Sequence, residues 1–93
     1  MSNTPGAWTD WNFAISPEAQ KVFNEALKGF VGATYTPLAF ASQIVAGVNY
    51  CFLCKAKGAY PNAPEKAVKL YIFEPLPMPG AHPHITEIVD VKP

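Results

Sequence analysis

Five apolar residues between positions 16 and 29 have the spacing of an amphipathic helix. They recur at i, i+3, i+4, i+7 and i+8 and would share one helix face: Ala19, Val22, Phe23, Ala26 and Leu27. The preceding Ser16-Pro17-Glu18 supplies a hydroxyl N-cap, a proline for the first turn and a carboxylate near the positive end of the helix dipole. Gly29 suits the first position after a helix. The pattern predicts one helix of about 12 residues.

Beyond this helix the apolar residues alternate with other residues, which is typical of β-strands. The alternation predicts four strands: 34–42, 48–57, 67–73 and 85–91. Ahead of the helix, Trp11, Phe13 and Ile15 alternate in the same way and indicate a short fifth strand. This order of elements predicts an α+β fold, with one short α-helix packed against an antiparallel sheet of four or five strands.

Composition and charge exclude several classes of function. The chain has 93 residues, enough to bury one core, and its seven lysines, no arginines and seven acidic residues give a net charge of zero. Without a basic surface it lacks the means to attract nucleic acid or anionic lipid, and no apolar run approaches the roughly 18 residues of a membrane span. Ten prolines indicate stiff loops, which suit a rigid binding protein. We therefore expect a single domain whose partners are neither nucleic acids nor membranes.

Residues 1–7 are small and polar, and they contain Pro5-Gly6. Such a terminus predicts a flexible N-terminal arm ahead of a single domain over residues 8–93. The arm lacks the basic start and apolar stretch of a secretory signal, which favours a cytoplasmic protein, although a mature secreted form that has lost its signal would look the same. Two cysteines are also too few for a disulfide framework.

The segment between the first two predicted strands carries the most specific pattern in the chain. It reads Gln43-Ile44-Val45-Ala46-Gly47 and is followed by Val48-Asn49-Tyr50. This resembles the Gln-x-Val-x-Gly first hairpin loop of the cystatin superfamily, whose members inhibit papain-like cysteine proteases. Pro5-Gly6 resembles the glycine-bearing N-terminal trunk of the stefin branch, and Glu74-Pro75-Leu76-Pro77 resembles its Leu-Pro second hairpin loop. The resemblance extends in the same order over nearly the whole chain.

The resemblance implies a cystatin-like fold and a reversible, tight-binding inhibitor of papain-like proteases that acts through the arm and both hairpin loops. Occlusion of the cleft is the mechanism, so the resemblance implies no catalytic residue, no cofactor and no metal, and the protein would not be an enzyme. The residues that it assigns to protease binding are Pro5, Gly6, Ala7, Gln43, Ile44, Val45, Ala46, Gly47, Leu76 and Pro77.

Elementary chemistry is consistent with these roles. A papain-like cleft is a narrow groove that holds a thiolate nucleophile, so an inhibitor must fill it without presenting a scissile carbonyl to the sulfur. Small Ala46 and Gly47 would let the loop backbone approach closely. Apolar contacts would come from Ile44 and Val45, with Gln43 hydrogen-bonding at the base of the loop. The arm and the second loop would add contacts on either side.

The chain departs from the stefin pattern in several places. The interval from Pro17 to Gln43 is shorter, Gly6-Ala7 replaces two adjacent glycines, and Met78-Pro79 enlarges the second loop, which also lacks the tryptophan of secreted cystatins. These departures leave open a non-inhibitory protein-binding module on the same scaffold. We expect a monomer, with exchange of a hairpin between two copies as an alternative.

The cysteines and histidines do not form a convincing metal site. Cys51 and Cys54 are three apart on a predicted strand, so they point to opposite faces and can neither bind one ion nor form a disulfide. Cys54 is expected to be buried as a small hydrophobic residue. His82 and His84 lie in a proline-rich loop, where we expect them to be exposed, and a mixed site with the cysteines would require all four to lie close together.

Trp8 and Trp11 have two interpretations. As large aromatic residues they would cover the helix or the sheet, and as a pair they could form a platform for a sugar or a peptide. Trp8 is also close enough to Gly6 in sequence to join a protease contact. Elsewhere, no spacing of serine, histidine and acidic residues specifies a catalytic triad.

Overall fold

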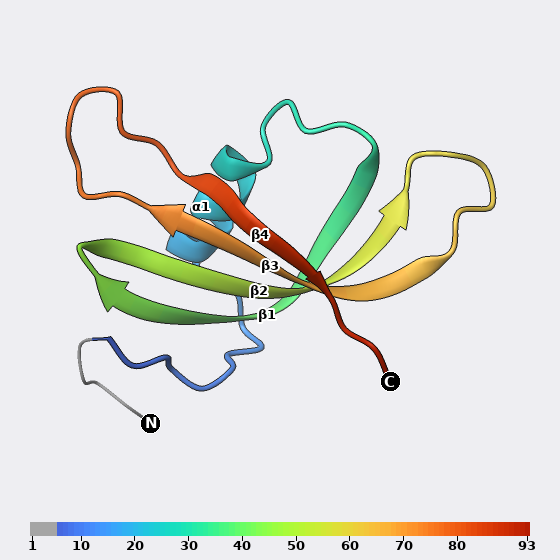
Figure 1. The fold of residues 1–93 in the computed structure, drawn as a ribbon, viewed down its shortest axis with the longest axis horizontal. Coiled ribbons are helices and arrows are strands. Elements are labelled where there is room, and N and C mark those ends of the chain that lie inside the picture. The colour runs from blue at the N-terminus through green and yellow to red at the C-terminus, as the bar shows by residue number, and fades with distance from the viewer. Residues whose placement is uncertain (1–5) are drawn as a thin grey trace.

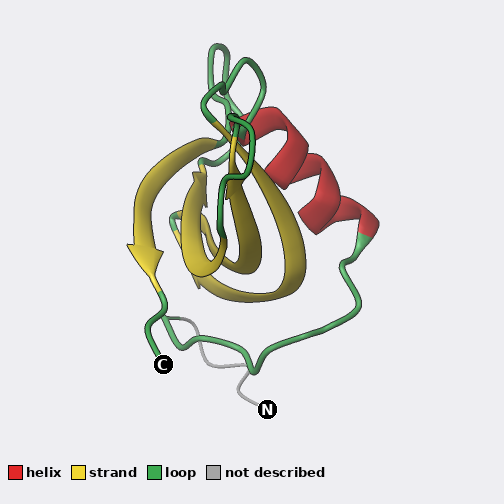
Figure 2. Ribbon diagram, turned by 90° about the vertical axis from the view of Figure 1, so that its right-hand side faces the viewer, coloured by secondary structure: helices red, strands yellow, loops and turns green. Residues whose placement is uncertain are grey.

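The computed structural model describes residues 6–93, which form one helix and a four-stranded antiparallel sheet. The elements follow the order α1 (Pro17–Ala26), β1 (Ala33–Val45), β2 (Gly47–Gly58), β3 (Glu65–Glu74) and β4 (His84–Asp90). Strands that are consecutive in the chain are neighbours in the sheet. The sheet is strongly twisted, and α1 lies across one of its faces (Figure 1 and Figure 2). The predicted α+β class, with one short helix and four strands, is therefore confirmed.

Helix α1 begins where the sequence predicts. The backbone of Ser16 is extended, its hydroxyl accepts a hydrogen bond from the N–H of Ala19 over 3.1 Å, and Pro17 occupies the first turn. The helix has 10 residues and is shorter than predicted, because the chain leaves it at Leu27 and turns through Gly29, whose φ of +79° is left-handed. Within residues 6–93, no helix has the length and apolar character needed to cross a membrane.

The core lies between α1 and the face of the sheet that the helix covers. Strands β2 and β3 each contribute alternate residues to it, which confirms the alternation predicted for both strands. Phe23 of α1 packs edge-on against Phe52 of β2, with ring centroids 5.0 Å apart. The buried residues of this cluster are Ala19, Val22, Phe23, Tyr50, Phe52, Cys54, Ala56, Val68, Leu70 and Ile72.

The segment that precedes the helix runs antiparallel along the outer edge of β1. Two isolated bridges join them, between Trp8 and Gln43 and between Asn12 and Phe40. In the second bridge the two backbones exchange hydrogen bonds of 2.8 and 2.9 Å. These contacts cover part of an edge strand that would otherwise present unpaired backbone groups to solvent.

The predicted fifth strand over residues 11–15 is wrong. The side-chain carbonyl of Asn12 accepts a hydrogen bond from the N–H of Ala14 over 2.9 Å, and this local turn directs the chain away from β1. Phe13 is exposed as a result. The alternating aromatic residues here therefore mark an irregular segment that touches the sheet at single points.

Candidate functional site

Three segments that are far apart in the sequence lie at one end of the sheet. With this strand order, the β1–β2 turn and the β3–β4 loop project from the same end. Gly6 lies there too, because the N-terminal segment runs beside the last residues of β1 (Figure 1). We call this surface the hairpin end; it consists of Gly6 and Ala7, residues 43–47 and residues 75–83. Pro5, which the resemblance also assigned to protease binding, lies outside the described residues.

The first hairpin is tighter than the sequence predicts. Strand β1 continues to Val45 and β2 begins at Gly47, and these two residues pair directly, so that only Ala46 lies between the strands. The prediction of a loop over residues 43–47 is therefore wrong in length. The β-branched side chains of Ile44 and Val45 favour extended backbone, so the pairing between β1 and β2 continues to the tip of the hairpin.

Gly47 is required by the fold itself. Its φ is +120°, a left-handed value that other residues rarely adopt. A Cβ atom built on it would lie 2.5 Å from the carbonyl oxygen of Glu74 and 2.9 Å from Cζ of Phe73. The sequence suggested that this glycine lets the backbone approach a protease, whereas its packing against β3 is sufficient to explain it.

Gln43 links the N-terminal segment to the first hairpin. Its side-chain Nε2 donates a hydrogen bond to the carbonyl oxygen of Gly6 over 2.9 Å. Its Oε1 accepts a hydrogen bond from Nδ2 of Asn49, on the neighbouring strand, over 2.8 Å. Sequence reasoning did not assign a role to Asn49. It could have been identified as a partner of Gln43, because the two polar residues lie directly opposite each other in the antiparallel pair.

Both hairpins present apolar side chains to solvent at this end. In the first, Ile44 is 62% exposed and Val45 is also exposed; in the second, Leu76 is 54% exposed and Met78 is exposed. Residues 43–47 and 75–83 contain no Asp, Glu, Lys or Arg. Exposed apolar groups gathered on a surface without charge are characteristic of a protein-binding site.

The second hairpin loop is stiff and built around a turn. Four of its nine residues are prolines, which restrict the backbone to a narrow range of φ. The N–H of Ala81 donates a hydrogen bond to the carbonyl oxygen of Met78 over 3.0 Å, with Gly80 between them at a φ of +82°. His82 and His84 are exposed, as expected, and His84 packs edge-on against Phe73 at the base of the loop.

The two cysteines are buried free thiols on opposite faces of β2. Cys54 belongs to the core, as predicted, and burial raises the pKa of its thiol to about 12. Burial also raises the pKa of Cys51, which faces away from the helix. Within the described part of the chain, no three or more histidine, cysteine or acidic side chains gather as metal ligands.

Trp8 and Trp11 cover the sheet on the face opposite α1, above Ala41 and Cys51. They are 38% and 43% exposed, so they are not part of the main core. This position is consistent with the predicted cover over the sheet, and it also leaves both rings accessible to a ligand.

Comparison of the chain with protein-family models, with curated proteins and with solved structures gave no match. A functional conclusion must therefore come from the residues and geometry of the hairpin end.

Proposed function

We propose that the protein is a reversible, tight-binding inhibitor of papain-like cysteine proteases, with a cystatin-like fold of the stefin type. It would occlude the active-site cleft with its N-terminal arm, its first hairpin and its second hairpin loop. The observation that carries the proposal is the convergence of these three segments at the hairpin end, each at a sequence position that resembles a stefin contact.

The arrangement of the elements supports the cystatin-like fold. A single helix precedes a meander of four antiparallel strands, and the segment before the helix lies along β1 (Figure 1). The segment Gln43-Ile44-Val45-Ala46-Gly47 lies at the first turn of this meander, and Leu76-Pro77 lies in the third connection. In that topology the first and third connections share one end of the sheet.

The shape of the first hairpin suits a narrow cleft. Its tip is a single small residue, Ala46, held on both sides by a hydrogen-bonded ladder. Such a tip is narrow enough to enter a groove, and the backbone of each flanking strand is already paired with the other strand, so it is less able to pair with the cleft as an isolated substrate strand does. Because the loop is already ordered, binding would require little further loss of conformational entropy.

The apolar side chains provide the contact energy. Ile44 and Val45 would cover one part of the cleft, and Leu76 with Met78 would cover the part beside it. The absence of charged residues from both hairpin segments means that insertion would leave no charge buried without a partner.

Titration of active-site-titrated papain with the purified protein tests the proposal, with hydrolysis of a small fluorogenic peptide as the readout. We expect reversible inhibition that reaches completion near one equivalent of inhibitor. Ala46→Arg should abolish it, because the long charged side chain projects from the exposed tip, while the fold is retained. Val31→Arg is the matched control, since Val31 is 86% exposed and precedes the opposite end of β1.

Inhibition by the wild type and Val31→Arg but not by Ala46→Arg would support the assignment. Equal inhibition by both variants would show that the first hairpin does not enter the cleft. Failure of the wild type to inhibit papain or a panel of related proteases would contradict the proposal and favour a non-inhibitory binding module that uses the same surface.

A further inference from the structure

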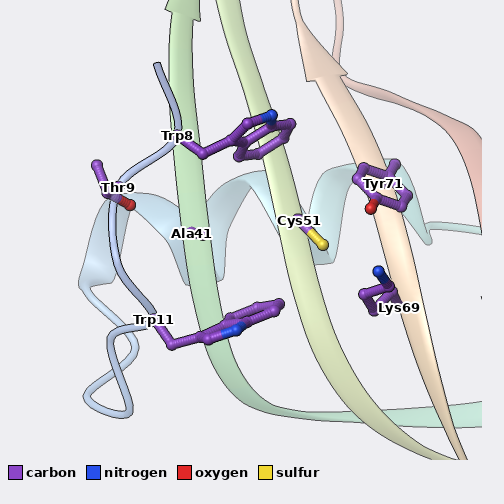
Figure 3. A pocket seen from close by; sticks show the side chains of 7 residues that line it. All are labelled: Trp8, Thr9, Trp11, Ala41, Cys51, Lys69 and Tyr71. Atoms are coloured by element: carbon purple, nitrogen blue, oxygen red, sulfur yellow. The ribbon is translucent and has the colours of Figure 1, made fainter. Parts of the chain in front are cut away.

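A pocket of about 200 Å³ lies on the face of the sheet that α1 does not cover. Figure 3 shows the indole rings of Trp8 and Trp11 projecting over β2 from the N-terminal segment, with the Cys51 thiol between them. Thr9 of the N-terminal segment and Ala41, Lys69 and Tyr71 of the strands complete the lining. The pocket is separate from the two hairpin tips.

Small side chains create the hollow. Ala41 and Cys51 pair directly across β1 and β2, and together they form its floor. Because neither side chain reaches above the sheet, the two indole rings stand as walls over an open space rather than packing onto larger residues. A bulkier residue at either floor position would fill it.

The walls are held in place by contacts that do not depend on a ligand. Trp8 pairs with Gln43 through a backbone bridge, and its ring meets that of Tyr71 edge-on, with centroids 6.0 Å apart. On the other side, the backbones of Asn12 and Phe40 are hydrogen-bonded one residue after Trp11. These contacts fix the backbone of the N-terminal segment and the Trp8 ring before a ligand arrives, which lowers the entropy that binding would cost.

A lysine gives the pocket a positive charge. Among the described residues that line it, Lys69 is the only charged side chain, and Figure 3 shows its ammonium group directed toward Tyr71. Burial raises the pKa values of both Cys51 and Tyr71, so these groups stay protonated and neutral near pH 7. Lys69 and Tyr71 lie on β3, whereas the two indole rings come from the N-terminal segment, which also contributes Thr9 to the lining.

We propose that this pocket binds a small planar aromatic carboxylate. The ring would lie between the indoles of Trp8 and Trp11, and the carboxylate would meet the Lys69 ammonium and the Tyr71 hydroxyl. A cavity of about 150 Å³ is enough to hold benzene, so this pocket accommodates one ring with a short acidic side chain. A sugar fits less well, because its several hydroxyl groups would find few hydrogen-bonding partners here. The proposal does not depend on protease inhibition.

Two-dimensional ¹H–¹⁵N NMR tests this directly, because the chain contains two tryptophans and both line the pocket. The probe is 3-phenylpropionate, and its amide is the neutral isostere. We expect the acid to shift both indole N–H signals saturably with a Kd between about 10 µM and 1 mM, and the amide to bind about tenfold more weakly. No saturable shift with the acid up to about 10 mM would overturn the proposal.

Variants distinguish the contribution of the Lys69 charge to binding from the contribution of the cavity's shape. Lys69→Gln should weaken binding of the acid about tenfold and leave binding of the amide unchanged, whereas the exposed helix variant Lys21→Gln should alter neither. Ala41→Val should fill the floor and abolish binding of both probes, with the rest of the spectrum confirming that the variant is folded. Equal affinities for acid and amide in the wild type, or unchanged affinity in Lys69→Gln, would overturn the proposed class of ligand.

Discussion

The backbone N–H of Gly6 donates a hydrogen bond to the carbonyl oxygen of Ile44 over 2.9 Å. This bond joins the N-terminal segment to the tip of the first hairpin, and the side chain of Gln43 adds a second bond to the carbonyl oxygen of Gly6. Gly6 is thus bound to β1 through both its N–H group and its carbonyl oxygen. The N-terminal segment and the first hairpin consequently form one surface, so a change in their connection should affect the proposed binding of a protease more than it affects folding.

Gln43→Ala tests this connection. The variant loses the hydrogen bonds to Gly6 and Asn49, and the N-terminal segment should detach more readily. We expect the inhibition constant against papain to rise about tenfold, while the thermal midpoint falls by only a few degrees, since these bonds lie near the surface. Gln20→Ala on the exposed side of α1 is the control and should change neither quantity. An unchanged inhibition constant in Gln43→Ala would contradict the role given to this residue.

Gly47→Ala should destabilise the protein strongly. The methyl group would require an unfavourable backbone conformation and would collide with the carbonyl oxygen of Glu74. We expect the free energy of unfolding in urea to fall by about 2–3 kcal/mol. Gly29→Ala also places a side chain at a positive φ, but nothing lies within 4 Å of its Cβ position, so it should lose about 1 kcal/mol. A smaller loss for Gly47→Ala than for Gly29→Ala would show that the contact with β3 relaxes freely.

Leu76→Ala should weaken inhibition without weakening the fold. The side chain is more than half exposed, so the folded protein gains little from it, whereas a protease surface would bury it. We expect about a tenfold higher inhibition constant against papain and a thermal midpoint within about one degree of the wild type. Leu38→Ala, which removes a leucine of similar exposure from β1, is the matched control. Equal losses of inhibition in the two variants would exclude a specific contact by the second hairpin loop.

The burial of Cys54 should make the protein less stable in alkaline solution. Its thiol ionises near pH 9.0 in the unfolded chain but only near pH 12 in the folded one, where burial raises its pKa. Below pH 9.0 the thiol is protonated in both states and has no effect on the pH dependence. Above it the unfolded state alone releases the proton, so stability falls between pH 9 and pH 12, by up to about 1.4 kcal/mol for each pH unit.

Urea unfolding of the wild type and of Cys54→Val at several pH values between 8 and 11 measures this effect. Valine is similar in volume and does not ionise, so the variant should lose stability less steeply above pH 9. Parallel curves for the two proteins would show that other groups, such as the buried Tyr50, account for the alkaline loss.

Local signals in the sequence were sufficient for the regular elements. The Ser16 hydroxyl and Pro17 marked the start of α1 because helix capping involves residues only three apart. Alternation identified the buried face of β2, since successive side chains on a strand point to opposite sides. The same reasoning failed for residues 11–15, where a hydrogen bond from Ala14 to the Asn12 side chain breaks the extended chain.

A sequence pattern was also sufficient to name candidate contact residues. It was not sufficient to explain why each of these residues is needed in the folded protein. The sequence marked Gln43 and Gly47 as members of a hairpin motif. It did not reveal that Gln43 binds Gly6 or that Gly47 leaves room for the backbone of Glu74. Both relationships join residues more than 25 positions apart, and no local propensity encodes such distances.

The sequence by itself determined the α+β class, the start of the helix, the alternating faces of the strands and the net charge of zero, because these follow from neighbouring residues and composition. The tertiary structure alone decided which segments meet. The register of β1 against β2 tightened the first turn to Ala46, the order of the strands gathered the hairpins at one end, and pairing of the N-terminal segment with β1 placed two tryptophans above small floor residues. These outcomes depend on pairing between strands that are far apart in the sequence. The register of each pair is set by the burial of one whole face of the sheet and not by neighbouring residues alone.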